Sequence, residues 1–144
     1  MPPNGSPRNG RRAMSQENVE AVRRTFDAMF TRDFRRAATG FHHDAVWHNT
    51  REFPGPSTCV GPQAIVEFWG TLMESFDGET NAEQIIDGEQ GVALGAHTVG
   101  QGTMSGVPLD LRWGIAARVA SGKISRVDVY GEWAKAVKAV GLAG

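Results

Sequence analysis

The spacing of apolar residues changes once along the chain, from a helical period to a strand period. Between Ser15 and Phe30 the apolar side chains recur three or four positions apart, which predicts an amphipathic helix of about 16 residues. Ser15 is a favourable N-cap for this helix. Asp33 can cap a second, shorter helix that ends at Gly40, and a third helix is predicted from Pro62 onward, because proline is tolerated in a first turn.

The rest of the chain is predicted to be mainly strands. Ala45 to Asn49 reads as a strand, and the following segment 51–62 reads as a loop because it contains three prolines and two glycines. After residue 79 the period is two, and four strands are predicted over 79–87, 92–104, 109–120 and 123–131. Their short, glycine-containing connections indicate an antiparallel meander, with a last helix over 132–140. Helices followed by strands are typical of an α+β domain with the helices on one face of a curved sheet.

Length, charge and hydrophobicity limit the number of domains and the kinds of partner that the chain can have. The 144 residues suit one domain, which we predict over residues 14–144, preceded by a disordered basic extension at residues 1–13 that is rich in Pro, Gly, Asn and Arg. A net charge of -1 gives no reason to expect a nucleic-acid partner. No apolar run approaches the ~20 residues of a membrane span, and no targeting signal is visible, so we predict a cytoplasmic protein with no membrane partner.

One cysteine and one histidine-rich segment could in principle support thiol or metal chemistry, but neither is predicted to do so. Cys59 is the only cysteine, which excludes an intramolecular disulfide, and without a local Cys-His signature we predict that it is inert. His42, His43 and Asp44 have the composition of a metal cluster, but adjacent side chains should diverge. We therefore predict no metal and no cofactor, and the chain contains no Walker loop, dinucleotide fingerprint or nucleophile elbow.

Three segments together carry a family resemblance: Ser15 to Glu20, Ala45 to His48, and Gly122 to Tyr130. With the order of elements, they resemble the SnoaL-like branch of the NTF2-like superfamily over Met14 to Leu142. The resemblance implies an α+β cone, in which a curved antiparallel sheet carries N-terminal helices on its concave face and encloses a pocket. The superfamily contains polyketide cyclases, ketosteroid isomerase, epoxide hydrolases, dehydratases and members without catalysis, so it indicates a fold and not an activity.

The resemblance also implies four catalytic candidates. In members similar to ketosteroid isomerase, the strand after the second helix presents an acid that moves a proton, and the matching position here is His48, whose imidazole can exchange protons near neutral pH. Matching the last strand directs Arg126, Asp128 and Tyr130 into the pocket, and period-two alternation places these three on one face. The four would supply a base, its orienting carboxylate, a phenolic donor and a guanidinium for a developing oxyanion.

The chain departs from the known activities of this superfamily at several positions. The oxyanion-binding tyrosine of the isomerase falls on Thr25, and the neighbourhood of its protonated aspartate falls on Trp113, Gly114 and Ile115. The Asp-Arg-Asp group of the epoxide hydrolases would lack its second aspartate near Trp113. Neither activity is therefore predicted.

Two interpretations of function remain open from the sequence. The first is a protein that binds a small apolar or polycyclic molecule. If this protein is an enzyme, it is expected to be a cofactor-independent isomerase, cyclase, dehydratase or hydrolase. The second is a non-catalytic ligand-binding or assembly module. In either case the expected pocket lining is aromatic and apolar with one imidazole, and it consists of Trp47, Phe68, Trp69, Met73, His97 and Trp113.

The resemblance further suggests a homodimer joined through the outer face of the sheet. Exposed apolar side chains on that face would otherwise remain in water, and Val99, Ile115 and Ala117 are the candidates for the contact.

Overall fold

The computed structural model describes residues 7–50 and 57–141, with side chains from residue 15 onward. The chain forms four helices and six strands within these ranges: α1 (Pro7–Phe30), α2 (Phe34–Thr39), β1 (Phe41–Asn49), β2 (Thr58–Val60), α3 (Pro62–Glu74), β3 (Phe76–Gly88), β4 (Gly91–Gly102), β5 (Pro108–Ala120), β6 (Lys123–Tyr130) and α4 (Trp133–Ala139).

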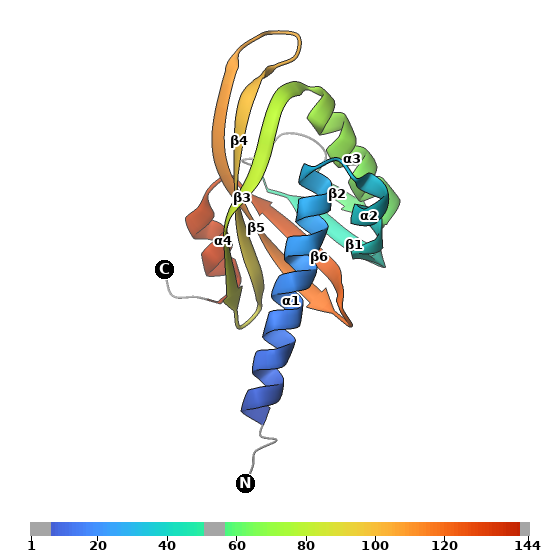
Figure 1. Cartoon of the computed structure of the whole chain (residues 1–144), viewed down its shortest axis with the longest axis vertical. Coiled ribbons are helices and arrows are strands. Elements are labelled where there is room, and N and C mark those ends of the chain that lie inside the picture. Colours follow the sequence, from blue (N-terminus) through green and yellow to red (C-terminus); the bar gives the residue numbers. More distant parts are fainter. Residues whose placement is uncertain (1–6, 51–56, 142–144) are drawn as a thin grey trace.

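A single six-stranded sheet organises the fold, with strand order β2-β1-β6-β5-β4-β3. All neighbouring strands are antiparallel except β1 and β6, which run parallel. Figure 1 shows the sheet curving around α1, α2 and α3, while α4 lies on its other side. The predicted α+β fold, with the N-terminal helices packed on a curved sheet, is confirmed.

The face toward α1, α2 and α3, which we call the inner face, holds the main core. Trp47 of β1, Val127 of β6, Ile115 of β5 and Leu94 of β4 are buried there, each at most 1% exposed. Register pairs Trp47 with Val127 and Ile115 with Leu94, so these side chains share one side of adjacent strands. The predicted apolar alternation in β5 therefore forms the inner wall of the cone.

The opposite, outer face carries a smaller core under α4. Ala93 of β4 and Ala116 of β5 pack there against Ala136 and Val140. This close packing depends on glycine, because a Cβ atom added at Gly114 would lie 3.0 Å from the Cβ of Ala136. Small residues on β4 and β5 thus let a short helix sit directly on the sheet.

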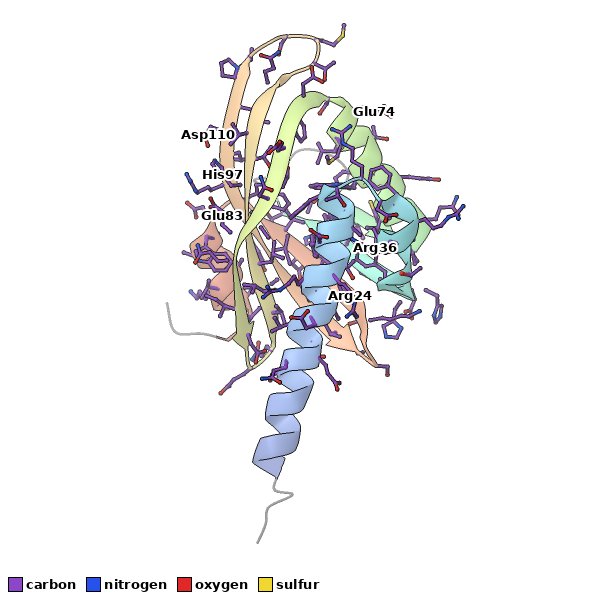
Figure 2. All side chains as sticks on the ribbon, viewed as in Figure 1. Arg24, Arg36, Glu74, Glu83, His97 and Asp110 are labelled. Carbon is purple, nitrogen blue, oxygen red and sulfur yellow. The ribbon has the colours of Figure 1, made fainter. Side chains whose placement is uncertain are left out.

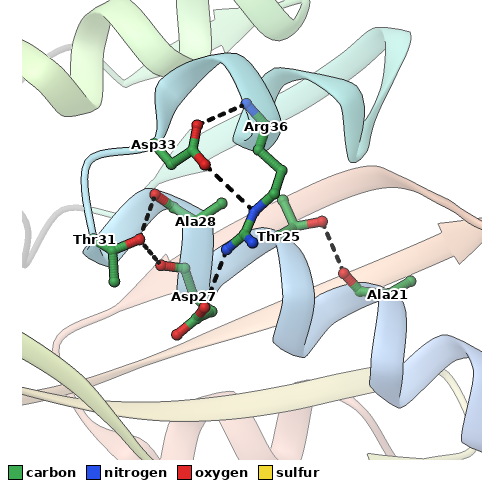
Figure 3. A network of polar contacts seen from close by, with 7 residues as sticks. All are labelled: Ala21, Thr25, Asp27, Ala28, Thr31, Asp33 and Arg36. Carbon is green, nitrogen blue, oxygen red and sulfur yellow. Dashed lines mark hydrogen bonds and ion pairs between the residues drawn. The ribbon is translucent and has the colours of Figure 1, made fainter.

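Side-chain capping shapes the connection between α1 and α2. The Asp33 side chain accepts a hydrogen bond from the Arg36 backbone N–H at 3.3 Å, and the Arg36 Nη2 atom donates to Asp27 Oδ2 at 3.1 Å (Figure 3). Gly40 follows the helix, and a Cβ atom there would collide with the Thr25 side chain of α1. The predicted cap at Asp33 and stop at Gly40 are confirmed, and they fix how α2 turns into β1.

Several boundaries differ from the predictions. Helix α1 begins at Pro7, so residues 7–13 of the segment predicted to be disordered are helical, and residues 1–6 lie outside the described residues. Proline suits a first turn, and a long helix extends at little cost once nucleated, so the first turns project beyond the sheet (Figure 1). Strand β2 lies inside the predicted loop, because Thr58–Val60 gains an antiparallel partner in β1. The first predicted strand of the meander, expected from residue 79, begins earlier, because β3 starts at the buried Phe76.

Candidate functional site

Aromatic side chains fill the middle of the cone. Phe26 and Trp47 stack with their ring centroids 5.9 Å apart, and Phe30 lies 5.7 Å from Trp69 and 6.1 Å from Trp113. Trp69 lies 6.2 Å from Trp47 and 5.8 Å from Trp113. Contacts at these distances add to the stabilisation from burial alone. The interior that the resemblance implied as a pocket is therefore largely occupied by the protein's own rings.

A cavity of about 320 Å³ remains at one end of the cone, beyond Trp69 and Trp113. It lies between the end of α3, the start of β3 and the hairpin joining β4 to β5. Its lining is mostly apolar and comprises Trp69, Leu72, Ser75, Phe76, Thr98, Gly102, Ser105, Val107, Pro108, Leu109, Leu111 and Trp113. This volume and lining are typical of a small-molecule site, at the small end of the usual range.

Hydroxyl groups supply the polar positions of this cavity. Thr98 Oγ1 accepts a hydrogen bond from Trp113 Nε1 at 3.0 Å and shares another with Thr80 Oγ1 at 2.8 Å, and both threonines are 5% exposed. Ser75 Oγ donates to the Leu72 carbonyl at 2.5 Å. Among the described lining residues there is no carboxylate and no imidazole. The cavity can accept or donate hydrogen bonds, but its lining offers no conventional acid or base.

The rim of the cavity is apolar and faces solvent. On the β4–β5 hairpin, Met104 is 97% exposed, Val107 61% and Leu111 40%. Val107 and Leu111 also line the cavity, so apolar surface continues from its wall to the exterior. Exposed apolar surface next to a concave site is typical of a place where another molecule binds.

The four predicted catalytic side chains share one face, but it is the outer face. Asp128 is the register partner of both His48 and Ala116, and Ala116 packs under α4. Tyr130 likewise packs against the small core under α4, and Arg126 forms two hydrogen bonds of 2.9 Å with Asp128. The prediction that β6 turns these residues into the pocket is wrong, because Val127 and Val129 occupy the inner positions of β6.

The prediction that His48 faces the pocket is wrong by one residue along β1. Ala45, Trp47 and Asn49 are the buried, inner positions of β1, so His48 points outward and contacts Thr58 Oγ1 through Nδ1 at 3.3 Å. A shift of one position moves a strand residue to the opposite face. Asn49, 3% exposed and accepting from Trp47 Nε1 at 3.0 Å, is the inner polar residue that the sequence reasoning missed. Counting by two from the buried Trp47 would have found it.

The outer ion pair is held by complementary hydrogen bonds, and not by deep burial. The hydrogen bonds to Asp128 raise the pKa of Arg126, and the Coulombic attraction of the same carboxylate adds to this. Between His48 and Asp128, both within the described ranges, no hydrogen bond forms. His48 and Asp128 are therefore neighbours on the outer face, but they are not hydrogen-bonded as the base and orienting carboxylate expected from the sequence would be.

The six predicted ligand-binding residues fall in three places. Trp69 and Trp113 line the cavity. Trp47 and Met73 are buried in the core, 1% and 2% exposed, and Phe68 is half-buried against that core. His97 lies on the outer face, so its expected place in the pocket is wrong. The lining residues missed by the sequence reasoning include Leu109 and Leu111, which extend the inner alternation of Trp113 and Ile115 toward the β4–β5 hairpin.

His97 belongs instead to an outer cluster of charges. Its Nε2 atom lies 2.6 Å from Asp110 Oδ1 and its Nδ1 atom 3.3 Å from Glu83 Oε2 (Figure 2). Arg112 Nε donates to Glu83 Oε1 at 3.0 Å. With a carboxylate at each ring nitrogen, the imidazole can donate to both only when it is protonated. This arrangement joins β3, β4 and β5 on the side remote from the cavity.

Neither Cys59 nor the segment 42–44 lines the apolar cavity. Cys59 is buried, and this burial raises the pKa of its thiol, which disfavours the reactive thiolate, in keeping with the predicted inert cysteine. His42, His43 and Asp44 place one ligand atom each within 4.8 Å of one another, so the expectation that these side chains diverge is wrong.

A second hollow, of about 220 Å³, lies where α1, α2 and the β5–β6 turn meet, and its lining is Arg24, Thr25, Arg36, Thr39, Gly40, Gly122 and Lys123. It is cationic in character, and its lining shares no residue with the apolar cavity. Within the described part of the chain, no helix has the combination of length and hydrophobicity needed to cross a membrane.

Comparison with known families adds a sequence match. A family model described as a SnoaL-like domain matches residues 22–127. This match begins in the second half of α1 and continues into β6, so it includes the aromatic cluster and the whole cavity lining. None of the curated proteins compared with the chain matches it.

Solved structures resemble the chain in fold at low sequence identity. TerC co-crystallised with polyporic acid has a TM-score of 0.69 at 17% identity, over 86% of this chain and 97% of TerC. An NTF2-like protein from Burkholderia xenovorans LB400 has a TM-score of 0.69 at 20% identity, over 87% and 96%. RV0760c from Mycobacterium tuberculosis, in complex with estradiol-17beta-hemisuccinate, has a TM-score of 0.64 at 16% identity, over 79% and 92%. Identities this low establish a common fold only.

Proposed function

The chain belongs to the SnoaL-like domain family, and we propose that it binds a small, largely apolar molecule in the cavity beyond Trp69 and Trp113. The observation that carries the proposal is the cavity itself: about 320 Å³ enclosed by indole, phenyl and aliphatic side chains, with a few hydroxyl groups. Such a composition favours ligands that bury apolar surface and make one or two hydrogen bonds.

A planar or ring-containing ligand fits this lining best. The two indole rings form one wall with centroids 5.8 Å apart, and ring systems stack favourably on such surfaces. Thr98 is the most buried hydroxyl of the lining, and when Thr80 is the donor of the bond between them, Thr98 keeps its own hydrogen for a ligand oxygen. The named ligands of two fold neighbours, polyporic acid and estradiol-17beta-hemisuccinate, are consistent with this class.

Binding without proton transfer is the form of the proposal that the geometry supports. His48, Arg126, Asp128 and Tyr130 lie on the outer face, and the described lining residues of the cavity include no residue that titrates near neutral pH. A proton-transfer role for these four would require a substrate on the outer face. We therefore place the ligand in the cavity and do not assign a reaction to it.

The test compares two substitutions that introduce the same side chain, tryptophan, on opposite faces of adjacent strands. Leu111→Trp should fill the cavity mouth, whereas Val99→Trp, at a position of similar exposure, adds the same ring to the outer face. Titration of the protein with estradiol-17beta-hemisuccinate, followed by tryptophan fluorescence, gives the affinity of each variant. We expect at least about a tenfold loss for Leu111→Trp and no loss for Val99→Trp.

Native mass spectrometry of the purified protein extends this test to an unknown ligand. A retained small molecule should dissociate from Leu111→Trp and remain on Val99→Trp. Equal affinities of both variants for every ligand detected would contradict the cavity assignment.

We also propose that the chain forms a homodimer through the part of the outer face that α4 leaves open. Val99 is 47% exposed there, whereas Ile115 and Ala117 are fully buried on the inner face and cannot contribute, which corrects the sequence-based candidates. Light scattering at micromolar concentration tests this proposal, and a monomer would contradict it. The same measurement on Val99→Trp separates a change in assembly from a change in ligand binding.

A further inference from the structure

A cluster of potential metal ligands stands at the start of β1, far from the apolar cavity. His42, His43 and Asp44 each place one ligand atom within 4.8 Å of the other two. His42 contacts Ala120 at the end of β5, whereas the cavity is lined by Pro108 and Leu109 at the beginning of β5. The whole length of this 13-residue strand therefore separates the two places.

An irregularity in β1 explains how three consecutive residues converge. Phe41 pairs with Ile124 and Val46 pairs with Arg126, so the β1 residues from His42 to Ala45 lie opposite the single residue Ser125. A bulge of this kind breaks the alternation of side chains and re-aims them. The divergence expected of neighbouring strand residues does not apply within it.

A hydrogen bond prepares His42 as a ligand. Its Nε2 atom lies 2.6 Å from the Ala120 carbonyl oxygen. A carbonyl oxygen only accepts, so Nε2 carries the hydrogen and, in the neutral ring, Nδ1 holds the free lone pair. Metal-bound histidines usually donate their second ring nitrogen in this way, which fixes both tautomer and ring orientation.

We propose that His42, His43 and Asp44 bind a divalent transition-metal ion of the zinc or nickel type. Two imidazoles and one carboxylate match the donor preference of these ions, and a hard ion such as magnesium would favour more oxygen ligands. Ligand atoms in a tetrahedral zinc site lie roughly 3.3 Å apart, so small side-chain rotations would close the present spacing. His43 and Asp44 are exposed, which leaves them free to rotate and leaves room for water as a further ligand.

A positive charge at the same end of the sheet would weaken metal binding at this cluster. Lys123 is the register partner of Ala120, so its ammonium belongs to the same end of the sheet and disfavours a cation. Neutralising it in Lys123→Gln should tighten metal binding by a few-fold. The bound ion would tie the start of β1 to the end of β5 through His42, and so stabilise the folded chain in proportion to its occupancy.

The experiment titrates ZnCl₂ into untagged full-length protein by isothermal calorimetry, with the melting temperature recorded in parallel. We expect one zinc ion per chain, a rise in melting temperature, and at least about a tenfold weaker affinity in His43→Ala and in Asp44→Asn. His48→Ala, which removes a partly exposed histidine from the same strand, should bind zinc as the wild type does. His42→Gln keeps a donor for the Ala120 carbonyl and should still lose affinity.

Nitrogen-15 NMR of the histidine rings supplies a readout that a purely structural role would not move. Zinc should shift the Nδ1 resonance of His42 and leave those of His48 and His97 in place. Absence of any binding up to about 1 mM zinc, undiminished binding by the His43→Ala and Asp44→Asn variants, or an equal loss in His48→Ala would each overturn the proposal.

Discussion

The inner and outer faces of the sheet differ in the types of residue that they carry. The inner face carries the aromatic cluster and the cavity, with polar groups limited to hydrogen-bonded residues such as Thr98 and Asn49. The outer face carries the ion pairs, Arg126 with Asp128 and His97 with Glu83 and Asp110. Residue types that suggest catalysis thus gather where solvent already stabilises their charges, whereas the described lining of the cavity has no carboxylate and no imidazole.

Removing an inner ring should have the largest effect. Trp69 is 2% exposed, touches three other aromatic rings and donates its Nε1 hydrogen to the Met29 carbonyl at 3.1 Å. Trp69→Ala should lower the free energy of unfolding by about 3–5 kcal/mol through the cavity left behind. Urea denaturation measures this change. Trp133→Ala, the same substitution on the half-buried α4, should cost clearly less, and equal costs would contradict the contrast between the faces.

A methyl group under α4 should have a smaller effect. Gly114→Ala brings a Cβ atom to 3.0 Å from the Cβ of Ala136, so α4 must shift outward. We expect the free energy of unfolding to fall by about 1–2 kcal/mol. Gly70→Ala is the matched control, because its Cβ would meet only the Phe34 ring at 3.6 Å and alanine favours a helix. If thermal unfolding shows the same loss in both variants, close packing of α4 is not the cause.

The outer ion pair should contribute less again. Asp128→Asn removes the carboxylate charge and at least one of the two 2.9 Å hydrogen bonds with Arg126, but the Arg126 side chain is 42% exposed and solvent screens the pair. We expect a stability change below about 1 kcal/mol, and an unchanged affinity for ligands of the cavity. His48→Ala should behave in the same way. A loss of ligand affinity in either variant would bring the outer face back into the site.

The smallest expected effect is a pH dependence from Cys59. Burial raises the pKa of its thiol, so the folded state disfavours the thiolate more than the unfolded chain does. The stability contribution is present below the unfolded pKa, about 8.5–9, and is lost as the pH rises through the folded pKa. Denaturation at a series of pH values from pH 8 to pH 10 gives the free energy of unfolding at each pH. This free energy should therefore fall less steeply with rising pH for Cys59→Ala than for the wild type. Parallel curves would show that burial of this thiol has no thermodynamic weight.

Local patterns in the sequence predicted the elements well, with instructive exceptions at their edges. The Asp33 cap, the Gly40 stop and the strands after residue 79 follow from short-range rules, and each is present in the structure. Strand β2 was missed because its three residues are too few to show an alternating pattern and depend on β1 for their hydrogen bonds. Helix α1 extends farther than its apolar stripe, because each further residue of a nucleated helix adds a backbone hydrogen bond whatever its side chain.

The candidate site was predicted only in part. Trp69 and Trp113 were recognised because large rings on alternating or helical positions point to the interior, and they do line the cavity. The family resemblance placed His48 one position out of register, and the same error of face affected Arg126, Asp128 and Tyr130. Period-two alternation shows which residues lie together, but it does not show which of the two faces they occupy.

The sequence by itself determined the class of fold, the alternation of each strand and the apolar character of the interior, because these depend on the spacing of neighbouring residues. Only the tertiary structure decided which face each strand presents inward, where a cavity remains between Trp69 and the β4–β5 hairpin, and that a bulge draws His42, His43 and Asp44 together. These depend on register between distant segments and on how completely side chains fill the space between them, and neither quantity is encoded in a local pattern.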